Sequence, residues 1–305
     1  MGSVKLSVKG WNSAAVRLAI LLVIVLQMQN PKVGWPQESA PPRLDGEFAK
    51  QEKIYSSRGA AVPGGYVTNR GLSDYKELLT SDFCDALSRL GSSDRWLDIG
   101  AGEGQAMLDY YALDDGTTST PTPKCVRSWA RARAVAMSIE DRQTDKWRQQ
   151  AAIFGADRLR YVSGKRLRSY SGEELGTFQI ITDVFGGFSY TEDLSVFLGK
   201  VLSLLDTGGS FYTMVQSVHL ESGKDKPKPW YLTELVDGAG QDVKVCSWLK
   251  QTTCVKVTCE SKSDWDQPTE LINIQKICSD VSVPSTKLVK FEAGNPPGRK
   301  FQLER

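Results

Sequence analysis

The sequence is poor in the residues from which metal sites and catalytic triads are most often built. Its 305 residues include a single histidine, His219, and none of the six cysteines forms a Cys-x-x-Cys pair. A zinc site is therefore not expected, and no cluster of carboxylates suggests another metal. The formal net charge is only +2, which gives no strong indication of a nucleic-acid partner.

The chain also has little that could cross a membrane. A membrane-spanning helix needs about 20 apolar residues, whereas the apolar run near the N-terminus covers only residues 18–26. Three basic residues and no acid precede it, an arrangement typical of a secretory signal. We expect residues 1–30 to be an export signal or a short anchor, with membrane association through residues 14–28. A cytosolic helix lying on the domain is the alternative.

The expected state of the cysteines depends on that choice of compartment. Four of the six fall in the last quarter of the chain, at Cys246, Cys254, Cys259 and Cys278. In an exported protein, one or two disulfides are expected there. In a cytosolic protein they would be buried small hydrophobic side chains, which is the default expectation.

The remaining sequence indicates a linker and one folded domain. Residues 31–65 are rich in proline, glycine, serine and charge, and they predict a linker before a domain at 66–305. Helical and strand patterns then alternate, which predicts parallel crossover units. Two final strands separated only by a loop should pair antiparallel. The expected helices cover 74–90, 105–113, 142–154 and 193–205, with a partly helical stretch at 231–250; the expected strands cover 96–99, 134–139, 159–163, 178–184, 210–215, 254–260 and 270–278.

A glycine-rich turn follows the first expected strand, where residues 95–104 read Arg-Trp-Leu-Asp-Ile-Gly-Ala-Gly-Glu-Gly. Glycine permits sharp turns and close ligand approach, and open α/β sheets bind ligands at the carboxyl ends of their strands. Dinucleotide sites use Gly-x-Gly-x-x-Gly, but Gln105 occupies the place of that third glycine, which disfavours a nicotinamide-dependent oxidoreductase. Asp98 would repel a pyrophosphate and suits a ligand with a cationic amino group.

Residues 96–104 resemble, without a gap, the first motif of class I S-adenosylmethionine-dependent methyltransferases, hydrophobic-Leu-Asp-hydrophobic-Gly-x-Gly-x-Gly. The resemblance covers about residues 66–278. It implies a Rossmann-like α/β fold: a doubly wound, mostly parallel seven-stranded sheet with helices on both faces and a C-terminal antiparallel hairpin. It also implies S-adenosylmethionine as cofactor and methyl transfer to an unidentified acceptor, for which a small molecule is favoured. A non-catalytic cofactor-binding protein on the same fold is the alternative.

The resemblance further implies residues for the cofactor site. An acid after the second strand would accept hydrogen bonds from the ribose hydroxyls, and Glu140 is a better candidate than Asp141. Many family members have an acid after the third strand to meet adenine. This sequence has Lys165 there, which leaves the backbone groups of Gly164 and Lys165. The expected cofactor-binding residues are Asp98, Gly100, Ala101, Gly102, Gly104, Glu140, Asp141, Gly164, Lys165 and Asp183.

Two residues are candidates for catalysis. Asp183 follows the fourth strand at a position that is commonly acidic in the family, where the segment borders the transferred methyl group. It could also, or instead, cap the following turn, with the nearby aromatic residues in the core. His219 is a candidate general base in an expected substrate-side loop at 217–230, although a lone histidine in a polar loop is usually structural or exposed.

Overall fold

The computed structural model describes residues 42–57, 69–112, 125, 131–216, 233–262, 269–294 and 297–304. The chain divides into two units, Met1–Pro41 and Pro42–Arg305, and every described residue belongs to the second. The expected signal or anchor at residues 1–30 lies outside the described residues and stays a prediction. Among the helices that are described, none is long and apolar enough to cross a membrane.

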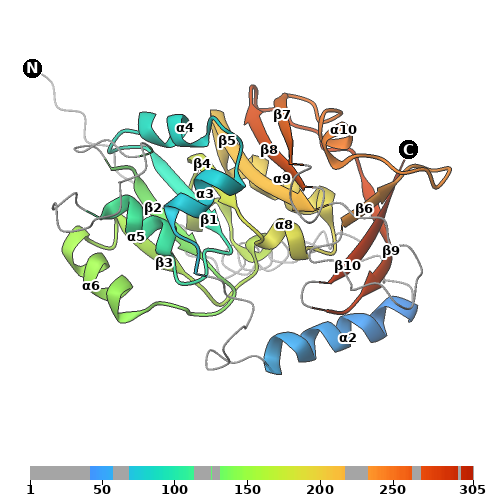
Figure 1. Cartoon of the computed structure of the whole chain (residues 1–305), viewed down its shortest axis with the longest axis horizontal. Helices are drawn as coiled ribbons and strands as arrows, with labels where there is room; N and C mark the ends of the chain where they lie inside the picture. The colour runs from blue at the N-terminus through green and yellow to red at the C-terminus, as the bar shows by residue number, and fades with distance from the viewer. Residues whose placement is uncertain are drawn as a thin grey trace, which may run out of the picture. The chain divides into compact units, whose positions relative to one another are not determined.

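A seven-stranded sheet runs through the described domain in the order β3-β2-β1-β4-β5-β8-β7 (Figure 1). The first five of these strands pair in parallel, and β8 runs antiparallel to both β5 and β7. The predicted fold class is therefore confirmed, including its C-terminal antiparallel hairpin. The strands are β1 (Arg95–Ile99), β2 (Arg133–Met137), β3 (Leu159–Val162), β4 (Phe178–Asp183), β5 (Leu205–Gln216), β7 (Val255–Lys262) and β8 (Thr269–Lys276).

Helices cover both faces of this sheet because its central strands are apolar on both sides. In β1, Trp96 and Leu97 are both fully buried, but they belong to different hydrophobic clusters, as the alternation of side chains along a strand requires. The Trp96 face is covered by α3 (Leu72–Leu78), α4 (Phe83–Arg89), α5 (Gln105–Tyr111) and α6 (Asp145–Phe154); the Leu97 face is covered by η1 (Leu167–Ser169), α7 (Gly172–Leu175), α8 (Gly187–Tyr190), α9 (Leu194–Leu204) and α10 (Val245–Leu249).

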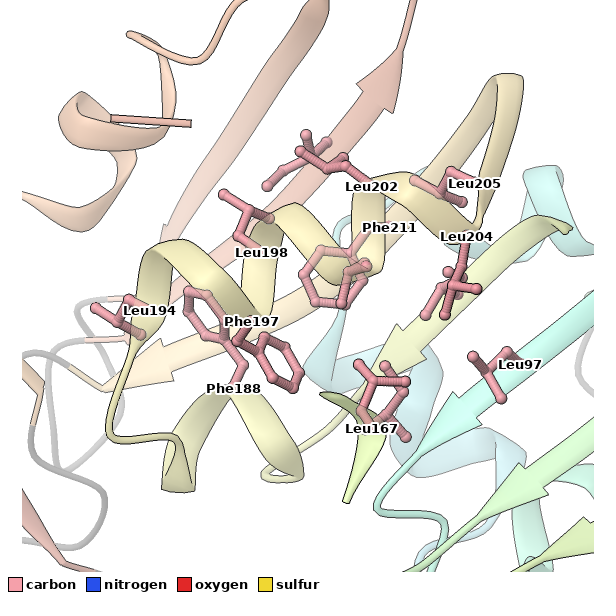
Figure 2. Packing of buried hydrophobic residues seen from close by; sticks show 14 of the residues in the cluster. Leu97, Leu167, Phe188, Leu194, Phe197, Leu198, Leu202, Leu204, Leu205 and Phe211 are labelled. Carbon is pink, nitrogen blue, oxygen red and sulfur yellow. The ribbon is translucent and has the colours of Figure 1, made fainter. Parts of the chain in front are cut away.

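The larger cluster is built around α9, the most apolar helix of the domain. Figure 2 shows Leu194, Leu198 and Leu202 along this helix, with Phe211 of β5 near them and Leu97 of β1 farther off in the same cluster. All five side chains are at most 1% exposed. Burying each such side chain stabilises the fold by about 1.5–3 kcal/mol, so α9 holds β4 and β5 against the rest of the sheet.

A second, three-stranded sheet was not foreseen from the sequence. It consists of β6 (Thr233–Val236), β9 (Thr286–Glu292) and β10 (Gly298–Leu303) in the order β6-β10-β9. The partly helical stretch expected at 231–250 is therefore wrong at its start, where β6 lies, and only the short α10 is helical. The helical prediction failed because β6 pairs with β10, more than sixty residues later, and no local pattern reports that partner.

The linker expected at 31–65 is wrong for residues 42–57, which form helix α2 (Pro42–Ser57). Figure 1 shows α2 beside β9. The rings of Phe48 and Phe291 lie 4.8 Å apart, and the side chain of Gln51 donates to the carbonyl of Gly294 at 3.0 Å. The apolar stripe of α2 is thin and the helix is rich in charge, so composition alone indicated a linker.

The single helix expected at 74–90 is two helices, α3 and α4. Leu79 leaves the helix in an extended conformation, and the hydroxyl of Thr80 donates to the carboxylate of Asp82 at 2.7 Å. Short polar side chains of this kind compete with the helical backbone for hydrogen bonds. Leu79, Phe83 and Leu87 still face one core, which is why their spacing looked continuous.

All six cysteines are paired, so the default expectation of buried thiols is wrong. The disulfides are Cys84–Cys125, Cys246–Cys259 and Cys254–Cys278. The second joins α10 to β7, and the third joins the residue just before β7 to the segment just after β8. Sequence spacing cannot give such pairings, because they depend on which segments the β7–β8 hairpin brings together.

Candidate functional site

The centre of the sheet contains a topological switch point between β1 and β4. From β1 the chain continues to β2 and β3 on one side, whereas β4 and β5 extend the sheet on the other side. The connections after β1 and β4 therefore leave the sheet in different directions, and ligands of open α/β sheets bind in the crevice this creates. The glycine turn at 100–104 lies at this carboxyl end of β1.

The turn has the backbone geometry that its glycines predicted. Gly100, Gly102 and Gly104 have φ values of 77°, 56° and 78°, a region in which other residues are strained. The amides of Gly100 and Ala101 both donate to the carbonyl of Met137, at 2.9 and 3.0 Å, which ties the turn to the end of β2. Gly104 then begins α5.

Close packing also requires glycine in this turn. A Cβ on Gly100 would lie 2.6 Å from the Cα of Gly186, and one on Gly104 would lie 2.3 Å from the ring of Trp147. The loop after β1 thus touches the loop after β4 at the switch point. Part of the glycine requirement is therefore structural, which the motif by itself did not reveal.

Asp98 lies beside the turn, as expected, but it is enclosed. Its side chain is fully buried and accepts hydrogen bonds at 2.7 Å from the hydroxyls of Tyr75 in α3 and Thr182 in β4. Burial raises the pKa of Asp98 to about 7, although both hydroxyls and the charge of Arg70 act against this rise. Nothing in the motif indicated Tyr75, which belongs to a separate helix.

The two acids expected to bind ribose lie in the exposed loop after β2. The carboxylate of Glu140 pairs with Arg142. Asp141 accepts from the backbone amide of Gln143 at 3.0 Å, and this hydrogen bond lowers the pKa of Asp141. Both acids are exposed after β2, and each already has a local partner.

The residue just before these acids, Ile139, is also exposed at this strand end. Ile139 is 57% exposed, although it directly follows the buried end of β2. Its carbonyl accepts from the amide of Gly164 at 2.8 Å, which joins the ends of β2 and β3. Gly164 has a φ of 89°, and a Cβ built on it would meet no atom within 4 Å. An apolar side chain therefore borders open space at this edge of the sheet.

The end of β3 carries two further contacts. The amine of Lys165 donates to the carboxylate of Glu174 at 2.6 Å, and this bond raises the pKa of Lys165, so its side chain is turned toward α7. The hydroxyl of Tyr161, in β3, donates to the carbonyl of Gly102 at 2.6 Å. Tyr161 was not foreseen, and it supports the glycine turn from the neighbouring strand.

Asp183 is a structural cap, and its predicted role at the transferred methyl group stays a prediction. It is fully buried, and its two oxygens accept from the backbone amides of Gly186 and Phe188, each at 2.9 Å. Burial raises the pKa of Asp183 to about 7, and the nearby Asp98 adds to the rise. The alternative interpretation, a cap with Phe188 in the core, is the one observed.

The loop after β4 is strained and held from several sides. Phe185 has a φ of 54°, which costs energy for a bulky residue and often marks a functional loop. The guanidinium of Arg70 lies 4.7 Å from the centre of its ring. From the second sheet, the fully buried Arg299 donates to the carbonyls of Phe188 at 3.1 Å and Thr191 at 2.7 Å.

Two parts of the predicted site lie outside the described residues. These are the candidate base His219 and the expected substrate-side loop at 217–230 that contains it. Within the part of the chain that the structure describes, no group of three or more potential metal ligands comes together.

Comparison with known proteins found distant structural likenesses only. No family model matches the chain, and no curated protein matches it. Among solved structures, 1,6-didemethyltoxoflavin-N1-methyltransferase of Burkholderia thailandensis, with bound 1,6-didemethyltoxoflavin and S-adenosylhomocysteine, is 15% identical; the match covers 78% of this chain and 92% of that one, with a TM-score of 0.45. An rRNA methylase of Streptococcus thermophilus is 12% identical over 64% of this chain and 94% of its own, with a TM-score of 0.36.

The CMeT domain of the citrinin polyketide synthase is also 12% identical, over 61% of this chain, with a TM-score of 0.39. The match covers 47% of that structure, so the chain spans about half its length. At such TM-scores these likenesses concern only the course of the chain.

Proposed function

We propose that the domain binds S-adenosylmethionine and transfers its methyl group to a small-molecule acceptor. The observation that carries this proposal is the position of the glycine turn, with its three positive-φ glycines, at the switch point between β1 and β4. Its Gly-x-Gly-x-Gly spacing favours this cofactor over a dinucleotide.

The residues around the turn fit such a ligand. Ile139 offers exposed apolar surface of the kind that a flat base covers, and Gly164 leaves open space beside it. Glu140 is exposed at the same strand end and could exchange its bond to Arg142 for ribose hydroxyls. In its ionised form, the carboxylate of Asp98 behind the turn favours a ligand that carries a cationic amino group.

The chemistry asked of the protein is positioning. When bound, S-adenosylmethionine supplies an activated methyl group, which passes to a lone pair of the acceptor while the sulfur keeps the electrons of the broken bond. The chain must hold the acceptor in line and exclude water. The loop after β4 is suited to this role, because Asp183, Arg299 and the ring contact with Arg70 fix the backbone around Phe185.

Cofactor binding is tested by calorimetric titration with S-adenosylmethionine, S-adenosylhomocysteine and NAD. We expect micromolar binding of the first two and none of NAD. Ile139→Asn should weaken binding about tenfold, since losing roughly 1.4 kcal/mol of apolar contact has that effect. Ile277→Asn is the matched control, because Ile277 is 56% exposed and lies beyond β8. Binding of NAD alone, or equal effects of the two substitutions, would refute the proposal.

Turnover needs a separate measurement. The protein is incubated with methyl-labelled cofactor and a fractionated small-molecule extract, and label is followed into the acceptor fraction. Labelled product that disappears with Ile139→Asn supports methyl transfer. Tight cofactor binding with no transferred label would instead support the non-catalytic binding protein.

We also propose that this domain folds in an oxidising compartment, with residues 1–30 acting as export signal or anchor. Three disulfides, which use every cysteine, are expected in such compartments and are rare in the cytosol. The test is fractionation combined with thiol alkylation of the protein taken directly from cells. Six protected cysteines in an exported or membrane fraction support the proposal, whereas free thiols in the soluble cytosolic fraction contradict it.

A further inference from the structure

A surface cavity of about 420 Å³ lies away from the glycine turn. It is on the face of the sheet that carries α4, over β4, β5, β8 and β7. Ile180 and Ser210 in its wall form a pair three residues before the Asp183–Thr213 pair that ends β4. The offset of three residues places this part of the wall roughly 10 Å from the end of β4, measured along the strand. Across the sheet, β8 is the third strand from β1, a distance of about 14 Å. The cavity is therefore not part of the site at the switch point.

The cavity has a polar floor because the sequence alternates there. Asn273 of β8 is paired with Tyr212 of β5 and Thr258 of β7, and these three form one row across the sheet. The next row contains Ser210, Gln275 and Lys256. On the opposite face, the intervening residues of β8, Ile272 and Ile274, are apolar and fully buried. A strand that is apolar on one face and polar on the other normally has its polar face in water, but here part of that face is enclosed.

Asn273 has an unused acceptor at the floor of the cavity. The side chain is only 8% exposed. Its Nδ2 donates to Asp82 at 2.8 Å, while its Oδ1 is buried and has no hydrogen-bond donor among the described residues. The orientation of the amide is fixed, because the Asp82 carboxylate can only accept. A buried acceptor without a donor is unfavourable, and a ligand N–H or O–H would satisfy it after a small shift of the side chains that cover it.

The charges around the cavity favour an anion. Arg89 of α4 and Lys256 of β7 both line it and are both exposed at its rim. The one carboxylate in the wall, Asp82, already accepts from Thr80 at 2.7 Å, from Tyr212 at 3.1 Å and from Asn273. Two cations therefore face one carboxylate, so the wall carries one net positive charge, and an added anionic group would be stabilised between the cations.

We propose that this cavity is a second binding site, for a small hydroxylated anion of the size of a sugar phosphate or a sugar acid. Its anionic group binds between Arg89 and Lys256, and one of its hydroxyls donates to Oδ1 of Asn273. A volume of about 420 Å³ lies in the range of sites that enclose small molecules. The site is independent of the proposed cofactor site and does not require methyl transfer.

The test is calorimetric titration of the full chain with glucose 6-phosphate and with glucuronate, which separates the two sources of negative charge. Glucose tests the need for the anion, and inorganic phosphate tests the need for the hydroxyls. We expect at least one of the two sugar anions to bind ten times more tightly than both glucose and phosphate. Lys256→Gln and Arg89→Gln should each weaken that binding at least tenfold, whereas Lys287→Gln, an exposed change on β9, should not.

Two further variants separate this site from the one at the glycine turn. Asn273→Ser should weaken binding of the sugar anion, and its thermal unfolding shows that the variant is folded. Ile139→Asn should leave sugar-anion binding unchanged. The proposal is overturned if neither sugar anion binds, if phosphate binds as tightly, or if the two rim substitutions have no effect. Failure of S-adenosylmethionine binding would not bear on it, because the two sites share no residue.

Discussion

The buried carboxylate of Asp98 makes the stability of the fold depend on pH. Its pKa is raised from 3.8 to about 7 by burial, so between these values the folded protein holds a proton that the unfolded chain has lost. The contribution of the protonated Asp98 carboxyl to the free energy of unfolding has its full value below about pH 4 and is lost as the pH rises toward 7. From pH 5 to pH 7 the loss is about 2 kcal/mol, because the slope is at most roughly 1.4 kcal/mol per pH unit and flattens as the pH nears the folded pKa. Asp183, with a pKa also raised to about 7, adds a similar amount.

Asp98→Asn removes this titration while keeping the size of the side chain and one acceptor oxygen. Urea unfolding at several pH values between 5 and 8 should show a steep fall in the free energy of unfolding for the parent protein. The slope of the variant should be about half as steep, because Asp183 remains. Asp141→Asn is the control, since its carboxyl is exposed and its pKa is lowered rather than raised. If Asp98→Asn leaves the slope unchanged, the reasoning from burial is wrong.

Three other predictions follow from contacts of the site and the fold. Gly100→Ala should destabilise the protein by about 2–4 kcal/mol in chemical unfolding, because its Cβ would meet a neighbouring backbone at 2.6 Å. Gly164→Ala, which also has a positive φ but open space, should cost only about 1 kcal/mol; equal costs would contradict the packing argument. Tyr161→Phe should cost about 1 kcal/mol by the same assay, through the lost bond to Gly102, and an unchanged midpoint would show that this bond adds nothing. Reduction of the three disulfides should lower the melting temperature strongly, since each contributes roughly 2–4 kcal/mol; a reduced protein that melts as the oxidised one does would exclude a structural role for them.

The sequence predicts the order of the central elements well, because that information is local. The alternation of strands and helices, the turn at 100–104 and the final hairpin each depend on patterns within about 15 residues. For Asp183, the local pattern fitted both a catalytic and a capping role. The two backbone amides within hydrogen-bond distance of its carboxylate establish the capping role, and the catalytic role stays a prediction.

The rest of the site depends on contacts between distant parts of the chain. Tyr75 meets Asp98 from a separate helix, and Arg299 reaches the loop after β4 across 108 residues. The orphaned oxygen of Asn273 exists only because three strands and α4 come together. Such contacts leave no periodic trace in the sequence, since each involves one side chain whose partner is set by the folded topology.

The contact between Arg299 and the loop after β4 also bears on when the site can form during synthesis. A ribosome adds roughly 5–20 residues each second, so Arg299 emerges about 5–20 s after Thr191, its partner 108 residues earlier. Throughout that interval the carbonyls of the loop must be satisfied by water. A growing chain could therefore complete its central sheet and still be unable to set the loop beside the glycine turn until its closing strand has been made.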